Sequence, residues 1–233
     1  MDTVILIGNT NTRIVWLTKR SIQKVTTVKT QGLEMVIPKM TFEKVGCVFV
    51  ASVVPDATSV VKKFIPDIRQ ITWKDFPKKI KVKEPQKVGI DRLLNAIGGW
   101  SLAKTECLII DAGSAITIDL VNKNGDFEGG VIFPGEKLIV ESLKNLALLK
   151  NIKVSKPASL LGENTSEAIG SGIFFGLSFL ISGYIDFFRK KNPNLVIFFT
   201  GGSGKGICQT TKIGCYNKNL GIIGIQAIIY GCS

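Results

Sequence analysis

The sequence of 233 residues contains no histidine. A histidine-based catalytic triad and a histidine-ligated metal site are therefore excluded. The five cysteines, at positions 47, 107, 208, 215 and 232, form no CxxC pair. This odd, irregular set fits reduced and mostly buried thiols, so we expect a cytoplasmic protein. The first residues lack a basic stretch followed by an apolar core, so we also expect no export signal.

Acidic residues are few relative to basic ones, with 18 Asp and Glu against 30 Lys and Arg and a net charge of +12. Such an excess raises the question of nucleic-acid binding. The lysines are scattered along the chain, however, and aromatic residues are not interleaved with them as a stacking platform would require. A solvated, lysine-rich surface is the preferred interpretation, and nucleic acid is not the expected partner. A positive field could also steer anionic ATP.

The stretch CLIIDAGSAITID, residues 107–119, predicts a buried strand, a tight turn at Gly113 and a second strand over 115–120. Glycine lets a ligand approach the backbone closely. Alternation places Ala115, Thr117 and Asp119 on one face of the second strand, which suits a phosphate group and its metal. The alternative is an ordinary hairpin in which Asp111 and Asp119 only cap turns.

A similar pattern begins the chain, where residues 4–17 read as an apolar run, a polar turn at 8–10 and a second apolar run. Two such hairpins about a hundred residues apart predict two related lobes that face a shared cleft. We place the lobes at 1–104 and 105–233. This organisation favours a two-lobed phosphotransferase over a single binding loop.

The remaining segments alternate between strand and helix patterns, which predicts an α/β fold with mixed sheets. Asp91 lies in the first turn of a predicted helix, where an ordinary capping role is the alternative to a chemical one. Residues 74–87 are rich in Lys and Pro and predict an exposed connection. Further strands are expected at 22–28, 47–51, 68–72, 126–135 and 195–202, and further helices at 56–65, 88–100, 136–149 and 220–230.

Residues 169–188 are strongly apolar and precede Arg189, Lys190 and Lys191. Length and flank fit a membrane span. Glycines, serines and an aspartate interrupt the run, and strand patterns lie on both sides of it. We therefore favour a helix buried in a core or interface, capped by Thr165, over a transmembrane helix.

Taken together, these motifs resemble the type III pantothenate kinases of the actin/sugar-kinase/Hsp70 superfamily. The resemblance spans nearly the whole chain, and its motifs occur in the family's order. The matching stretches are 8–11, 51–55, 89–92 with Asn95 and Ala96, 111–119, 129–135, Thr165 with 168–172, and 200–202.

The resemblance implies two ribonuclease-H-like lobes and ATP-dependent phosphorylation of pantothenate, the first step of coenzyme A synthesis. It implies that Gly89, Ile90, Asp91 and Arg92 bind pantothenate, with Asp91 as the proton acceptor. Thr165 would contact pantothenate from the neighbouring subunit of a homodimer. Asp111 would hold a monovalent cation, K⁺ or NH₄⁺, beside ATP and Mg²⁺. The ATP-binding residues would be Leu6, Ile7, Gly8, Asn9, Thr10, Asn11, Thr12, Arg13 and Ser114, the last where the family usually has Thr.

One position departs from the family's pattern Asp-x-Gly-Asn-Thr, because Leu6 stands where the aspartate belongs. Asp2 has the same strand parity but lies about 13 Å back along a strand. Either Asp111 and Asp119 suffice for the metal, or catalysis is weakened, or the residue is an engineered change. Two rival functions stay open at this point. One is a non-catalytic relative that acts as an accessory factor, and the other is a superfamily kinase for a sugar or acetate.

Overall fold

The computed structural model describes residues 1–40, 46–146, 149, 153–155 and 157–231. The chain forms two compact units. Unit 1 comprises Met1–Leu102, Gly125–Phe127 and Leu220–Ser233, and unit 2 comprises Ala103–Asn124 and Glu128–Asn219. The sequence expectation of 1–104 and 105–233 differs from this division mainly at the C-terminus.

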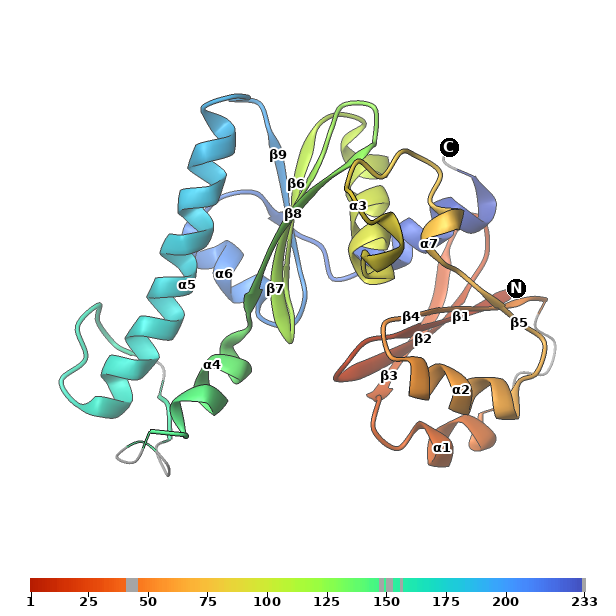
Figure 1. Ribbon diagram of the computed structural model, residues 1–233, viewed down its shortest axis with the longest axis horizontal. Coiled ribbons are helices and arrows are strands. Elements are labelled where there is room, and N and C mark those ends of the chain that lie inside the picture. The colour runs from red at the N-terminus through yellow and green to blue at the C-terminus, as the bar shows by residue number, and fades with distance from the viewer. Residues whose placement is uncertain (41–45, 147–148, 150–152, 156, 232–233) are drawn as a thin grey trace. The chain divides into compact units, whose positions relative to one another are not determined.

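Unit 1 is built on a five-stranded mixed sheet with the order β3-β2-β1-β4-β5 (Figure 1). Strand β1 pairs antiparallel with β2 and parallel with β4. Helices α1 and α2 contribute Leu33, Ala57 and Val61 to a core shared with β1, β2 and β4. The bounds are β1 Asp2–Ile7, β2 Asn11–Leu17, β3 Ile22–Lys29, α1 Leu33–Val36, β4 Val48–Ser52, α2 Pro55–Phe64, β5 Ile68–Gln70, α3 Ile90–Ala103 and α7 Leu220–Tyr230, with short 3₁₀ turns at Ile37–Lys39, Trp73–Asp75 and Pro85–Lys87.

Unit 2 repeats this plan, with a second five-stranded sheet in the order β10-β9-β6-β7-β8. Strand β6 pairs antiparallel with β7 and parallel with β9, as β1 does with β2 and β4. The two sheets therefore share their strand order, and their central strands pair in the same directions, so the predicted pair of related mixed-sheet lobes is confirmed. The bounds are β6 Cys107–Ala112, β7 Ala115–Val121, β8 Phe127–Pro134, α4 Glu136–Leu143, α5 Thr165–Arg189, β9 Val196–Thr200, α6 Gly204–Thr211 and β10 Cys215–Tyr216.

Helix α7 returns to unit 1 because it packs closely on α3. A Cβ at Gly224 would lie 1.8 Å from the carbonyl oxygen of Leu94, and one at Gly98 would lie 2.1 Å from that of Leu220. Glycine at these positions lets the two helix backbones approach. The Gln226 amide also donates to the carbonyl oxygen of Thr18 at 2.7 Å. These contacts are long-range, which is why local sequence patterns assigned α7 to the second lobe.

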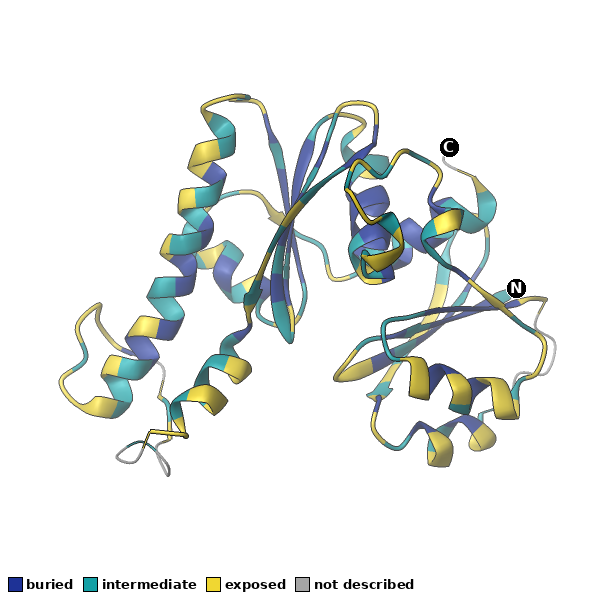
Figure 2. Ribbon diagram, viewed as in Figure 1, coloured by how far each residue is buried: buried dark blue, intermediate teal, exposed yellow. Residues whose placement is uncertain are grey.

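Helix α5 packs one face on the unit 2 sheet through Ile173, Leu177, Ile181 and Ile185. Figure 2 shows this face buried and much of the helix surface partly or fully exposed. By length and composition alone, α5 is the one helix of the described residues that is long and apolar enough to cross a membrane. The predicted cap is wrong: Asn164, not Thr165, is the N-cap, and its side chain accepts the Glu167 N–H at 3.0 Å.

Helix α4 ends at Leu143, although the apolar spacing predicted a helix to residue 149. Ile139 and Val140 pack against the unit 2 core, but residues 144–146 beyond the helix are exposed, so no tertiary packing extends it. Residues 147, 148 and 150 lie outside the described part. Strand boundaries otherwise fall within a few residues of those expected, and α7 has the predicted bounds.

Candidate active-site elements

In unit 1 the turn between β1 and β2 presents polar groups at the end of the central strand. The Gly8 N–H donates to the carbonyl oxygen of Asn11 at 3.1 Å, and Asn9, Thr10 and Asn11 are exposed. Thr30, a residue that no sequence motif indicated, braces this turn. Its hydroxyl donates to the Gly8 carbonyl oxygen at 2.6 Å, and its N–H donates to that of Thr10 at 3.1 Å.

The segment that leads into α3 lies beside the same end of the unit 1 sheet. The Val53 N–H, just after β4, donates to the carbonyl oxygen of Ile7 at 3.1 Å. A Cβ placed on Gly89 would lie 3.7 Å from Val53 Cγ1. Val53 therefore connects the segment at 6–13 with the segment at 89–92. Carboxyl ends of neighbouring parallel strands are where α/β folds commonly bind ligands.

Asp91 is accessible to solvent, and its carboxylate folds back over the start of α3. Its Oδ1 accepts the Arg92 N–H at 2.8 Å and would lie 2.6 Å from a Cβ on Gly89, so glycine makes room for it. Desolvation raises the pKa of the Asp91 carboxyl, against the opposing effects of the Arg92 N–H and charge. Ile90 is buried, and the Arg92 guanidinium lies 5.4 Å from the centre of the Phe127 ring.

In unit 2, Asp111 lies near the end of β6, and glycines lie close to its side chain. A Cβ on Gly201 would lie 2.4 Å from Asp111 Oδ1, and one on Gly113 would lie 3.4 Å from it. The Gly113 N–H closes the tight turn on the carbonyl oxygen of Ala115 at 3.0 Å. Gly135 packs against the same turn, and its N–H donates to the Ser114 carbonyl oxygen at 3.1 Å. Glycine at 201 leaves the space that the Asp111 carboxylate occupies, and glycine at 135 lets its backbone approach the carbonyl oxygens of Gly113 and Ser114.

Two side chains with oxygen atoms, Thr117 and Asp119, lie on β7, the strand that pairs with β6 beside Asp111. Thr117 is directly opposite Asp111 in the β6–β7 register, and its buried hydroxyl has no hydrogen-bond partner among the described residues. Directly opposed residues share a face of the sheet. Asp119 is only 1% exposed, and Gly130 leaves the space that its carboxylate occupies. Within the described part, no cluster of three or more Cys, Asp or Glu side chains could hold a metal ion.

Thr165 is exposed as the first residue of α5. The expected site residues thus belong to both units: the segments at 6–13 and 89–92 to unit 1, and Asp111, Ser114 and Thr165 to unit 2. Within unit 1 the segments at 6–13 and 89–92 lie at the strand ends, and within unit 2 Asp111 and Ser114 lie at the β6–β7 turn, whereas Thr165 lies at the start of α5.

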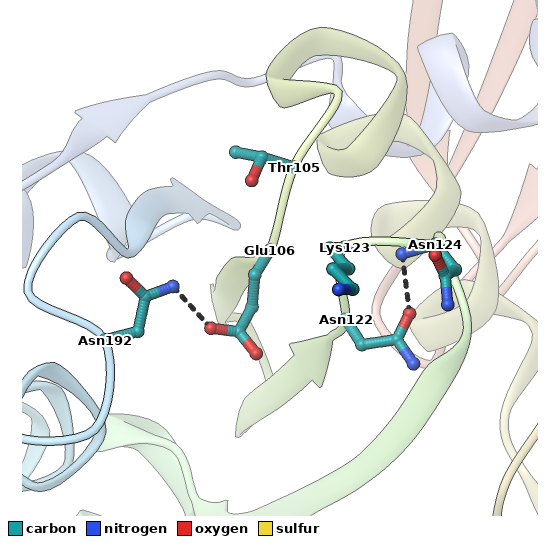
Figure 3. Close-up of a pocket in the computed structure, with 6 residues that line it drawn as sticks. All are labelled: Thr105, Glu106, Asn122, Lys123, Asn124 and Asn192. Carbon is teal, nitrogen blue, oxygen red and sulfur yellow. Dashed lines mark hydrogen bonds between the residues drawn. The ribbon is translucent and has the colours of Figure 1, made fainter.

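A pocket of about 330 Å³ lies at the other end of β6 from Asp111 (Figure 3). Polar groups of its lining contact one another: the Asn192 side-chain amide donates to the Glu106 carboxylate at 2.5 Å, and the Asn124 backbone N–H donates to Asn122 Oδ1 at 2.9 Å. None of the expected site residues lines it. The remaining lining residues are Thr105 and Lys123.

Solved structures with a similar fold cover almost the whole chain. A Campylobacter jejuni protein described as a conserved Baf family transcriptional activator superposes with a TM-score of 0.68, at 23% identity over 97% of this chain and 96% of that chain. The activator of 2-hydroxyisocaproyl-CoA dehydratase from Clostridium difficile gives 0.57 at 13% identity, over 99% and 94%. At these identities the likeness concerns the fold.

Sequence relatives are more specific. Type III pantothenate kinases from Persephonella marina and Geotalea daltonii are 36% and 31% identical, over 82% and 80% of this chain and 79% and 77% of their own lengths. The family model for type III pantothenate kinase matches residues 4–186. That range includes both glycine turns, Asp91, Asp111 and Thr165. The chain belongs to the type III pantothenate kinase family.

Proposed function

We propose that this protein transfers the terminal phosphoryl group of ATP to the hydroxyl of pantothenate, forming 4'-phosphopantothenate in the first step of coenzyme A synthesis. The observation that carries the proposal is the family match over residues 4–186. It includes the polar turns of both units and the acid at the start of α3. The accessory-factor alternative has no observation of comparable strength, because its structural relative is only 23% identical.

The proposed acceptor site consists of Gly89, Ile90, Asp91 and Arg92. Asp91 takes the proton of the pantothenate hydroxyl as that oxygen attacks phosphorus, and its place in the first turn of α3 supports this role. A raised pKa makes the carboxylate a better proton acceptor than an ordinary aspartate. The Arg92 guanidinium is suited to a carboxylate such as that of pantothenate.

The proposed nucleotide site consists of Leu6, Ile7, Gly8, Asn9, Thr10, Asn11, Thr12, Arg13 and Ser114. Backbone N–H groups and exposed amide and hydroxyl groups in the 8–11 turn can donate to phosphate oxygens. The ATP substrate enters with Mg²⁺, which neutralises charge that develops on the phosphates.

Asp111 is the proposed ligand of a monovalent cation, K⁺ or NH₄⁺. A single carboxylate opposite an unpartnered Thr117 hydroxyl supplies hard oxygen atoms and one negative charge. That donor set is compatible with the monovalent cation that the family resemblance implies. The cation would supply positive charge beside the phosphates.

A homodimer with a shared active site is the proposed assembly, with Thr165 reaching the partner's pantothenate. Exposed apolar side chains on α5 support this assembly, because Phe179 and Phe187 are 60% and 54% exposed and a second copy of the chain could cover them. We place the protein in the cytoplasm. Cysteines 47, 107, 208 and 215 form no disulfide, but Cys47 and Cys215 are exposed, so the expectation of mostly buried thiols is wrong. Burial raises the pKa of the Cys107 thiol to about 12, so this cysteine is inert.

The function is tested with radiolabelled ATP, pantothenate, magnesium and potassium. Label transfer to pantothenate is the expected result. A sugar or acetate in place of pantothenate tests the other superfamily reactions, and a nucleic-acid binding assay on the same preparation tests the accessory-factor alternative. No transfer to pantothenate by a folded protein would refute the proposal.

A further inference from the structure

Tyr216 lies at the end of β10 and contacts the loop that follows the neighbouring strand β9. Its hydroxyl donates to the carbonyl oxygen of Gly201 at 3.3 Å. Its ring atoms lie 3.4 and 3.6 Å from the position of a Cβ on Gly204, which is ordinary van der Waals contact. One side chain therefore touches both ends of the 201–204 turn. Tyr216 is outside residues 4–186, so the family match assigns it no role.

The 201–204 turn also packs against Asp111. Gly201 has a φ of +83°, and a Cβ there would lie 2.4 Å from Asp111 Oδ1 and 2.6 Å from the carbonyl carbon and oxygen of Ala112. The Ser203 N–H donates to the same Ala112 carbonyl oxygen at 3.0 Å. With so little space between them, a shift of Gly201 changes the room and the orientation available to the Asp111 carboxylate.

We infer that Tyr216 is a positioning residue, which holds the 201–204 turn against Asp111 and so fixes the carboxylate for the cation and nucleotide. The hydroxyl fixes the turn at Gly201, and the ring supports it at Gly204. Tyr216 acts through Gly201 and does not itself touch the Asp111 carboxylate in the contacts described. The inference rests on the proposed function, because it needs Asp111 to serve the kinase reaction.

A purely structural role makes a different prediction. Tyr216 also packs against the unit 2 core, so losing it could lower stability alone. Tyr216→Phe keeps the ring and removes only the hydroxyl. Tyr184→Phe is the matched control, because Tyr184 belongs to the same unit and its ring packs edge-on against Phe133 at 5.7 Å.

The experiment uses the full chain and two readouts. The first is amide hydrogen exchange over residues 200–208, which needs neither substrate nor cation. The second is phosphorylation of pantothenate titrated separately with potassium, ATP and pantothenate. For Tyr216→Phe we expect faster amide exchange in this segment. We also expect the potassium concentration for half-maximal activation and the KM for ATP to rise about three- to tenfold, which corresponds to the loss of one hydrogen bond. KM for pantothenate should change less than about twofold on the same scale.

The readouts separate the ways in which the inference can fail. Unchanged exchange would show that the hydroxyl does not hold the turn. Faster exchange with unchanged potassium and ATP dependence, or equal effects in Tyr184→Phe, would reduce Tyr216 to a core residue. If the unaltered protein does not phosphorylate pantothenate, the proposed function fails, and exchange alone decides whether Tyr216 holds the turn. If potassium does not affect the unaltered enzyme, the link to cation binding is overturned.

Discussion

At the residue scale, the first prediction concerns Asp91. We expect Asp91→Asn to reduce turnover by about 10² to 10⁴, because the amide cannot accept the proton of the attacking hydroxyl. The Arg92 N–H can still bond to the amide oxygen, so the start of α3 should be preserved. The measurement is kcat, alongside the melting temperature and ATP affinity. Near-normal turnover would show that another group is the base.

The raised pKa of Asp91 also predicts the acidic limb of the rate profile. The base works only when deprotonated, so the rate falls as pH drops through its pKa. Because desolvation raises that pKa, the fall should occur at higher pH than for an ordinary aspartate. The measurement is kcat/KM for pantothenate across the acidic range. An acidic limb at or below the ordinary aspartate value of 3.8 would contradict it.

The second residue to test is Leu6, an apolar side chain at the position where the family's pattern has an aspartate. Leu6 is partly exposed, lies opposite Arg13 in the β1–β2 register, and is not among the buried residues that pack with α1 and α2. An aspartate at position 6 would share a face with Arg13. We therefore expect Leu6→Asp to fold and to lower both the KM for ATP and the magnesium requirement, since magnesium prefers oxygen ligands.

Leu6→Asn controls for shape without the charge and should leave the magnesium requirement unchanged. A Leu6→Asp protein that melts earlier and uses ATP no better would show that Leu6 only packs in the sheet. The cost would then be that of a buried, unpaired carboxylate.

At the element scale, Tyr230 of α7 and Asp2 of β1 form a hydrogen-bonded clamp between the two elements, which can be tested on its own. The Tyr230 hydroxyl donates to the Asp2 carboxylate, which also accepts the Cys47 N–H at 2.9 Å. Desolvation raises the pKa of Asp2, but these hydrogen bonds and the N-terminal charge outweigh it, so the pKa lies below its ordinary value. We expect Tyr230→Phe to lower the free energy of unfolding by about 1 kcal/mol at neutral pH.

The sign of the pH dependence follows from the lowered pKa. The clamp contributes stability above the unfolded-state pKa of Asp2, and this contribution is lost as pH falls through the folded-state pKa. The difference between wild type and Tyr230→Phe in urea unfolding should therefore be larger at about pH 7 than at about pH 3. Tyr184→Phe is again the control, and a difference independent of pH would contradict the role of Asp2.

Local patterns predicted those elements whose signal is local. The two strand-turn-strand hairpins follow from apolar runs on either side of glycine, and α7 follows from an uninterrupted apolar run over 220–230. The predicted end of helix α4 was too late because the apolar spacing continues past Leu143, where residues 144–146 are exposed. Helix α6 was missed, since its Gly-rich sequence has weak intrinsic helix propensity and its place depends on packing beside β9 and β10.

The roles of the site residues stay predictions, and local sequence shows only some of the contacts around them, for the same reason. Glycines at 8, 89, 113 and 201 were found in motifs, and each lies where a side chain would meet a neighbour. Thr30 and Tyr216 were not found, because their hydrogen-bond partners lie 15 or more residues away in sequence. Their hydrogen bonds depend on strand pairing, and a single sequence carries no local signal for such partners.

At the scale of the whole molecule, the exposed surface of α5 predicts the state of assembly. Its core-facing residues repeat every four positions, while Phe179 and Phe187 are largely exposed. A helix with apolar residues on two faces is stable in water only if the second face is covered. We expect light scattering in detergent-free buffer to give the mass of two chains at micromolar concentration.

Phe179→Glu should break that dimer without unfolding the protein, since the side chain is 60% exposed and its replacement leaves the core of unit 2 intact. If Thr165 completes the partner's site, the monomer should also lose pantothenate phosphorylation. Met35→Glu is the matched control, because Met35 is 66% exposed on α1 of the other unit. It should leave both mass and turnover unchanged. A wild-type monomer with full activity would remove the shared site, and partition into the membrane fraction would instead assign the exposed face of α5 to lipid.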